Sequence, residues 1–150
     1  MTSNNIFKSN KLILLFLFKN KIIHNESYVF DYLKNKQYYN LYFHSEIGYI
    51  PTSEELNLIN SFNEGEFDEK CNLGENNTYI CNLIRNDLID EFVSYINRNN
   101  ISLSSQIKQS IFETNTFLLN NNDTTFIEYA AFFGSIQIFN YLRFSNAQMS

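Results

Sequence analysis

The stretch Thr125–Leu142 reads TFIEYAAFFGSIQIFNYL and carries the clearest structural pattern in this sequence of 150 residues. It opens on a threonine, whose hydroxyl group can cap a helix. Gly134 lies in its middle, where a turn after a helix often needs a positive φ. Ile138, Phe139 and Leu142 then recur at helical spacing. The stretch therefore predicts two helices joined by a tight turn at Gly134.

A second helix–turn–helix is predicted upstream, over residues 80–101. Asp87 stands there near the place that Gly134 takes in the later hairpin, and the two positions are 47 residues apart. The two hairpins therefore read as degenerate copies with an insertion between them, at residues 101–120. We expect a further helix inside the insertion, over residues 102–114, and a polar turn over residues 120–123.

The pattern of Thr125–Leu142 resembles an ankyrin repeat without gaps. That family begins its repeat with Thr-Pro-Leu-His-x-Ala-Ala-x-x-Gly, and here Phe126 replaces the proline and Glu128 the histidine that normally bonds the threonine hydroxyl. The usual repeat is about 33 residues long, so the insertion adds about 14. The resemblance implies an all-α fold, with helical hairpins stacked as a degenerate ankyrin-like α-solenoid over 78–150 and its best repeat at 124–147.

Further segments resemble a large protozoan ankyrin family that pairs a helical N-terminal domain of unknown function with ankyrin repeats. The segments that carry this resemblance are Ile6–Lys11, Tyr79–Arg85, Ser110–Asn115 and Ile127–Leu142. Because members of that family are much longer, the resemblance implies a short or truncated member. A gene fragment or truncated paralogue without independent function is the alternative interpretation, and self-association through an uncapped C-terminal repeat is a further expectation.

The remainder divides into a helical region over 1–62 and an acidic linker over 63–77. Helices are expected over 6–23 and 26–36, whereas 38–50 is ambiguous between helix and strand. The first includes an unbroken apolar run of seven residues that is too short to span a bilayer, so we interpret it as a buried helix rather than a signal-peptide core. Thr52 and Glu55 form the pattern of a capping box. The acidic linker does not match a calcium-binding EF-hand loop.

Composition argues against several classes of function. The net charge is -5 and no basic face is apparent, so nucleic acid is a poor partner. Cys71 and Cys81 lack further thiols or histidines at ligand spacing, which favours free thiols in a cytoplasmic protein without metal or cofactor. No phosphate loop, zinc motif or nucleophile elbow is present, and pairing His44 with Glu46 or Cys81 would be arbitrary. We expect a protein that is not an enzyme.

The resemblance implies a protein-binding role with an unidentified protein partner. Contact residues of ankyrin proteins lie at the turn tip and along the first helix of a repeat. Carried onto this sequence, these positions are Asn121, Asn122, Thr124, Phe132 and Phe133. Two adjacent phenylalanines there would form a contact patch. The alternative is that the inserted segment covers them.

Overall fold

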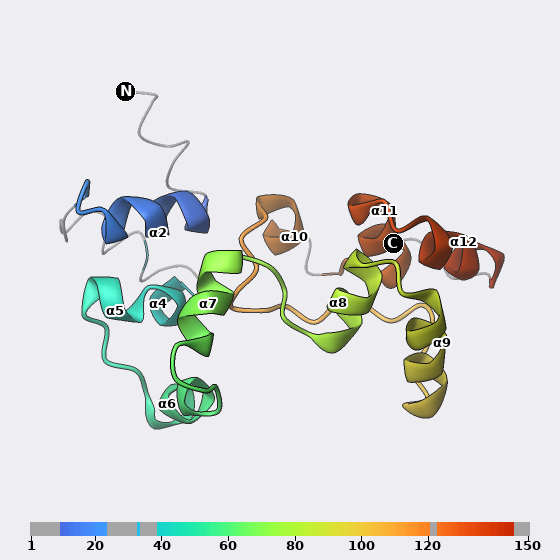
Figure 1. Cartoon of the computed structure of the whole chain (residues 1–150), viewed down its shortest axis with the longest axis horizontal. Helices are drawn as coiled ribbons and strands as arrows, with labels where there is room; N and C mark the ends of the chain where they lie inside the picture. Colours follow the sequence, from blue (N-terminus) through green and yellow to red (C-terminus); the bar gives the residue numbers. More distant parts are fainter. Residues whose placement is uncertain (1–9, 24–32, 34–38, 121–122, 146–150) are drawn as a thin grey trace. The chain divides into compact units, whose positions relative to one another are not determined.

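The computed structural model describes residues 10–23, 33, 39–120 and 123–145, and within them it is mostly helical (Figure 1). Within those ranges, the β-structure consists of an isolated antiparallel bridge between Gln106 and Thr125. The predicted all-α class is therefore confirmed. The chain forms two compact units: unit 1 contains residues 1–75 and 111–116, and unit 2 contains residues 76–110 and 117–150.

Unit 1 contains five described helices: α2 (Lys11–Lys19), α4 (Tyr39–Tyr42), α5 (His44–Ile47), α6 (Ser53–Asn60) and α7 (Glu66–Leu73). Helix α2 is shorter than the predicted 6–23, because the chain leaves the helix at Asn20 and Lys21 has a positive φ of 55°. The ambiguous stretch 38–50 becomes α4 and α5. Residues 1–9 and nearly all of the helix predicted over 26–36 lie outside the described residues.

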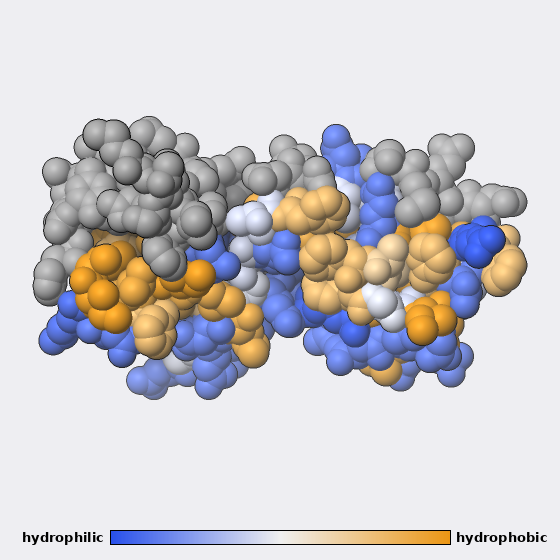
Figure 2. Space-filling view, turned by 90° about the horizontal axis from the view of Figure 1, so that it is seen from above, coloured by the Kyte–Doolittle hydropathy of each residue, from blue (hydrophilic) through white to orange (hydrophobic). Residues whose placement is uncertain are grey.

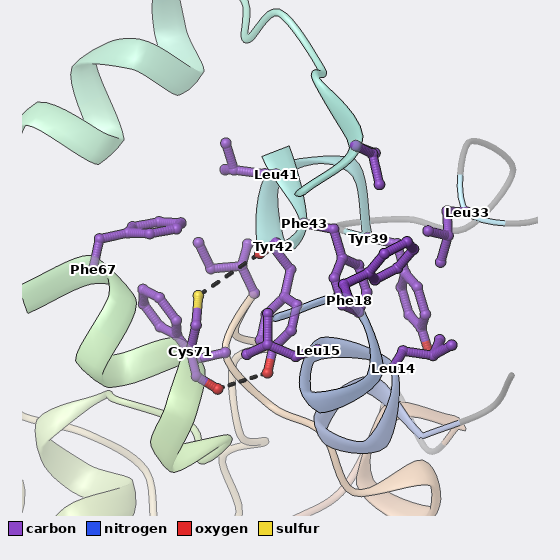
Figure 3. Close-up of a cluster of buried hydrophobic side chains, with 13 residues drawn as sticks. Leu14, Leu15, Phe18, Leu33, Tyr39, Leu41, Tyr42, Phe43, Phe67 and Cys71 are labelled. Atoms are coloured by element: carbon purple, nitrogen blue, oxygen red, sulfur yellow. Dashed lines mark hydrogen bonds between the residues drawn. The ribbon is translucent and has the colours of Figure 1, made fainter. Parts of the chain in front are cut away.

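The core of unit 1 gathers apolar side chains from α2, α4, α5 and α7 (Figure 3). Leu14, Leu15 and Phe18 of α2 are buried, which fits the expectation of a buried helix, although Phe16 on the same apolar run is 61% exposed. The Tyr42 hydroxyl donates to the Cys71 carbonyl over 2.6 Å, so this bond ties α4 to α7 inside the core.

The predicted capping box at the start of α6 is confirmed. The Thr52 amide donates to the Glu55 carboxylate over 2.7 Å, and the Glu55 amide donates to the Thr52 hydroxyl over 3.3 Å. These reciprocal bonds satisfy amides that the first turn of a helix otherwise leaves without partners. The bond from the Thr52 amide is the main reason that the pKa of Glu55 is lowered.

The acidic linker predicted over 63–77 is wrong as a loop, because most of it folds into α7. Phe67 and Cys71 lie four residues apart and therefore share one helix face, which is buried in unit 1. The acidic residues that made the segment look like a solvated loop lie largely in the first turn, where the helix dipole favours negative charge. Unit 2 begins at Asn76, and the predicted repeat region 78–150 also contains residues 111–116, which belong to unit 1.

Unit 2 contains α8 (Tyr79–Arg85), α9 (Ile89–Arg98), α10 (Thr116–Asn120, in unit 2 from Phe117), α11 (Phe126–Phe133) and α12 (Ile136–Phe144). Both predicted hairpins are present, as α8–α9 and α11–α12. Helix α8 contacts α11, and α9 contacts α12. One shared core lies among them, with Phe92, Ile138 and Leu142 fully buried.

The helix predicted over 102–114 is wrong: this segment has short turns and otherwise irregular backbone. Its apolar residues cannot share one helix face, because Ile107 is buried in the core of unit 2 whereas Ile111 and Phe112 are buried in unit 1. The Ile107 amide donates to the Thr124 carbonyl over 2.7 Å, and the Phe126 amide donates to the Ser105 carbonyl over 3.2 Å. The insertion thus supplies hydrogen bonds at the start of α11. Residues 121–122 of the predicted polar turn lie outside the described residues.

Candidate functional site

Helix α11 carries two of the predicted contact residues, Phe132 and Phe133, and is fixed at both ends by local bonds. At its start, the Thr125 amide and hydroxyl group both donate to the Glu128 carboxylate, over 2.8 and 2.7 Å. Glu128 therefore bonds the threonine hydroxyl, although it is not the histidine that the ankyrin pattern has there. At its end, Gly134 adopts a φ of 71°, which lets the chain turn into α12.

Two phenylalanine rings form a stack on the surface of unit 2. Phe117 of α10 and Phe132 of α11 have ring centroids 5.6 Å apart and planes only 2° from parallel. Phe117 is 54% and Phe132 43% exposed, so both rings keep much of their area open to water after pairing. Figure 2 shows apolar side chains gathered on the surface of unit 2 in the region of α10 and α11. We call Phe117 and Phe132 the aromatic pair.

A layer of more deeply buried side chains supports Phe132 of the aromatic pair. The Phe133 ring meets Phe132 edge-on, with centroids 5.0 Å apart, and lies 4.7 Å from the Tyr129 ring. The Arg85 guanidinium lies 5.9 Å from the Phe133 centroid and donates to the Tyr129 hydroxyl over 2.9 Å. Arg85 belongs to α8, so the layer joins both hairpins of unit 2.

The predicted contact residues therefore differ in their surroundings. Phe132 is exposed, whereas Phe133 is partly buried and packs inward. Thr124 is wrong as a contact residue, because it is only 6% exposed. Asn121 and Asn122 lie outside the described residues. The inserted segment does reach Phe132 through Phe117, as the alternative expected, but both rings remain exposed.

Sequence reasoning missed Phe117. The signal was the apolar triplet Phe117-Leu118-Leu119 inside the insertion, where a short helix can bury only part of its surface. Leu118 takes the buried position, at 7% exposure, and Phe117 is left outside. A short helix that packs on the rest of a unit typically buries one side chain and exposes the next.

Several hydrogen bonds join the end of the first helix of the first hairpin, and its turn, to the start of α12. The Asp87 carboxylate accepts from the amides of Gln137 and Ile138, each over 3.0 Å. The Ser135 hydroxyl donates to the Ile84 carbonyl. Asp87 thus caps a helix 50 residues further along the chain, and it can do so because its φ of 52° turns the chain at the end of α8.

A separate cluster of ionisable groups is buried in unit 1. The Lys11 ammonium donates to the carbonyls of Ile111 and Glu113, over 2.9 and 3.0 Å, and lies 5.0 Å from the ring centroids of Tyr39 and Tyr42. Burial lowers the pKa of Lys11 from 10.5 to about 8, although the nearby Glu113 opposes that shift. The sequence gives no signal for this burial, because lysine side chains are seldom fully buried.

Burial also keeps the neighbouring acids of this cluster neutral. It raises the pKa of the Cys71 thiol to about 12 and raises the pKa of the Tyr42 hydroxyl. A thiol in this state is a poor nucleophile. Cys71 and Cys81 are both free and buried. Among the described residues, no group of His, Cys, Asp and Glu side chains could hold a metal ion.

Within the same residues, none of the helices has the length and apolar character needed to cross a membrane. In comparisons with protein-family models, curated proteins and solved structures, the chain matches none of them.

Proposed function

We propose that this protein is a non-catalytic, ankyrin-type protein-binding module in which the aromatic pair contacts a protein partner. The observation that carries the proposal is the exposure of both stacked rings. Water-exposed aromatic area of this kind contributes strongly to protein interfaces, because large rigid rings bury much apolar surface at little cost in side-chain entropy. A rigid helix presents Phe132, and the Phe133–Tyr129 layer restrains it from beneath.

The ankyrin-type part of the proposal rests on the repetition between the hairpins of unit 2. In the first hairpin the Leu88 amide donates to the Leu83 carbonyl, and in the second the Ser135 amide donates to the Ala130 carbonyl. In each bond the donor residue lies five positions after the acceptor residue. The second pair of residues follows the first by 47 positions. Asp87 and Gly134 have positive φ at equivalent places in these turns. Successive hairpins with equivalent turns are the usual unit of α-solenoids.

The rest of the proposal follows the same expectations. The partner is a protein rather than nucleic acid, since the chain carries 16 acidic residues against 11 Lys and Arg. A reducing compartment such as the cytoplasm suits two free thiols. Self-association is the competing function. It would use a different surface, on α12, where Ile136 and Phe144 are 69% and 79% exposed.

The proposal is tested by replacing both rings of the aromatic pair with serine in the full chain. The wild type and the variant are immobilised, and proteins captured from extracts of the producing cells are compared by mass spectrometry. We expect the double variant to lose a partner that the wild type retains. Its free energy of unfolding should fall by no more than about 1 kcal/mol, because both rings are already exposed.

Phe144→Ser is the matched control, since it removes a ring that is 79% exposed elsewhere in unit 2. The control should retain the partner. Loss of the partner from the Phe144→Ser variant, with retention by the double variant, would place the contact on α12 and overturn the proposal. Equal capture by all three proteins would also overturn it.

A further inference from the structure

Residues 111–116 are a return segment: the chain leaves unit 2 after Ser110, contributes these residues to unit 1, and re-enters unit 2 at Phe117. The segment is not helical before Thr116, so its backbone must find partners elsewhere. The Glu113 carboxylate accepts from the amides of Thr114 and Asn115, over 3.0 and 2.8 Å. These local bonds shape the segment but do not attach it to unit 1.

Three of the contacts that attach the return segment to the rest of unit 1 involve Thr114, Phe112 and Lys11. The Thr114 amide and hydroxyl group donate to the Gly74 carbonyl, over 3.1 and 2.8 Å. The Phe112 ring packs edge-on against Phe62 and Phe67, with centroids 5.6 and 5.2 Å away. Lys11 supplies the third contact, through its bonds to the two carbonyls of the segment.

The Lys11 contact differs from the other two because it buries a charge. Lys11 has no exposed surface. Removing an ammonium group from water costs free energy unless paired charge and hydrogen bonds offset it. Here two carbonyls and the charge of Glu113 offset part of this cost, while burial remains the largest influence on the group.

We propose that the return segment opens and closes over Lys11 independently of the rest of unit 1, and that the buried charge of Lys11 makes opening easier. A neutral amine still has two N–H groups, which match the two carbonyls that Lys11 contacts. Loss of the proton therefore keeps both hydrogen bonds and removes the cost of burying the charge. Closure strengthens when Lys11 becomes neutral.

The direction of the pH effect follows from proton binding in the two states. Opening the segment admits water to Lys11, so its pKa rises toward the ordinary value of 10.5; when the segment is closed, the pKa is about 8. Between these values the closed state binds fewer protons, so closure strengthens as pH rises through this window. Below about pH 8 both states hold the proton and the effect fades. From pH 7 to pH 9 closure should strengthen about tenfold.

Other titratable groups lie on the described elements that face Lys11 or pack against α2. They are Tyr39 and Tyr42 of α4, His44 and Glu46 of α5, Glu66, Asp68, Glu69, Lys70 and Cys71 of α7, and Glu113 of the return segment. Tyr42 and Cys71 stay neutral in this window because burial raises the pKa of each. Substitution of Lys11 separates its effect from that of the remaining groups.

The test is the hydrogen-exchange protection of the Thr114 amide in the full chain, corrected for the intrinsic exchange rate at each pH. We expect wild-type protection to rise about tenfold between pH 7 and pH 9. In Lys11→Arg it should stay constant, because the guanidinium does not deprotonate in this range. The Gly74 amide, bonded within α7 to the Lys70 carbonyl over 3.1 Å, reports the opening of the helix itself.

Two results would overturn the inference. Equal protection of the Thr114 and Gly74 amides at both pH values would mean that the segment never opens by itself. If wild-type protection of the Thr114 amide is unchanged or falls from pH 7 to pH 9, the charge of Lys11 does not control opening of the segment. This measurement needs no variant. Neither result bears on the aromatic pair, whose partner capture is measured separately.

Discussion

Replacing Phe92 with alanine is expected to lower the free energy of unfolding of unit 2 by about 3–5 kcal/mol. Phe92 of α9 is fully buried, and its ring meets Phe126 of α11 and Tyr141 of α12 edge-on, with centroids 6.1 and 6.3 Å away. One ring therefore joins both hairpins. Its removal deletes apolar burial and leaves a cavity between helices that cannot close fully. Urea unfolding followed by helical circular dichroism measures the loss.

Phe144→Ala is the matched control, because it removes the same ring from a position that is 79% exposed. We expect the control to change the free energy of unfolding by less than about 0.5 kcal/mol. Equal losses for the two variants would contradict the core described for unit 2.

Gly74→Ala is expected to destabilise unit 1 by about 2–4 kcal/mol. Gly74 has a φ of 68°, which an alanine adopts only with strain. An added Cβ would also lie 2.8 Å from both the Leu12 side chain and the Thr114 hydroxyl oxygen. The side chains of Leu12 in α2 and Thr114 in the return segment would both have to move. The same unfolding measurement detects this loss.

Gly48→Ala separates strain from crowding. Gly48 has a similar φ of 62°, but a Cβ there meets no atom within 4 Å. The control should therefore cost only about 1 kcal/mol, from strain alone. If both variants lose the same stability, the close approach of α2 and the return segment at Gly74 is contradicted.

Local signals made the hairpins predictable from sequence. Thr125, Gly134 and the spacing from Ile138 to Leu142 act within a few residues of one another, so the pattern predicted both helices and the turn of α11–α12. The capping box of Thr52 and Glu55 was equally local, and the structure contains both of its bonds.

Features that depend on distant contacts could not be read in this way. Helix α7 looked like an acidic loop because only the core of unit 1 gives Phe67 and Cys71 a reason to be buried. The insertion looked helical because the sequence does not reveal that Ile107 and Phe112 enter different cores. Division of one segment between two units overrides its local helical tendency.

The candidate site shows the same limit. Phe132 was predicted from its place in the repeat, but the burial of Thr124 follows from the pairing of the insertion with residues before α11. Phe117 could not be assigned to the site, since its stacking partner lies 15 residues away across a turn. Asp87 matched Gly134 in the sequence, yet its contact with α12 required the packing of two hairpins.

The packing of the two hairpins of unit 2 against each other underlies the account of the aromatic pair, and Asp87 tests it most directly. The measurement is the hydrogen-exchange protection of the Gln137 and Ile138 amides in the wild type, in Asp87→Ala, and in Asp90→Ala as a control from the exposed first turn of α9. We expect Asp87→Ala to lower protection of both amides selectively, because it removes the carboxylate that accepts from them. Protection unchanged in Asp87→Ala, or lowered equally in Asp90→Ala, would contradict the described packing of the hairpins.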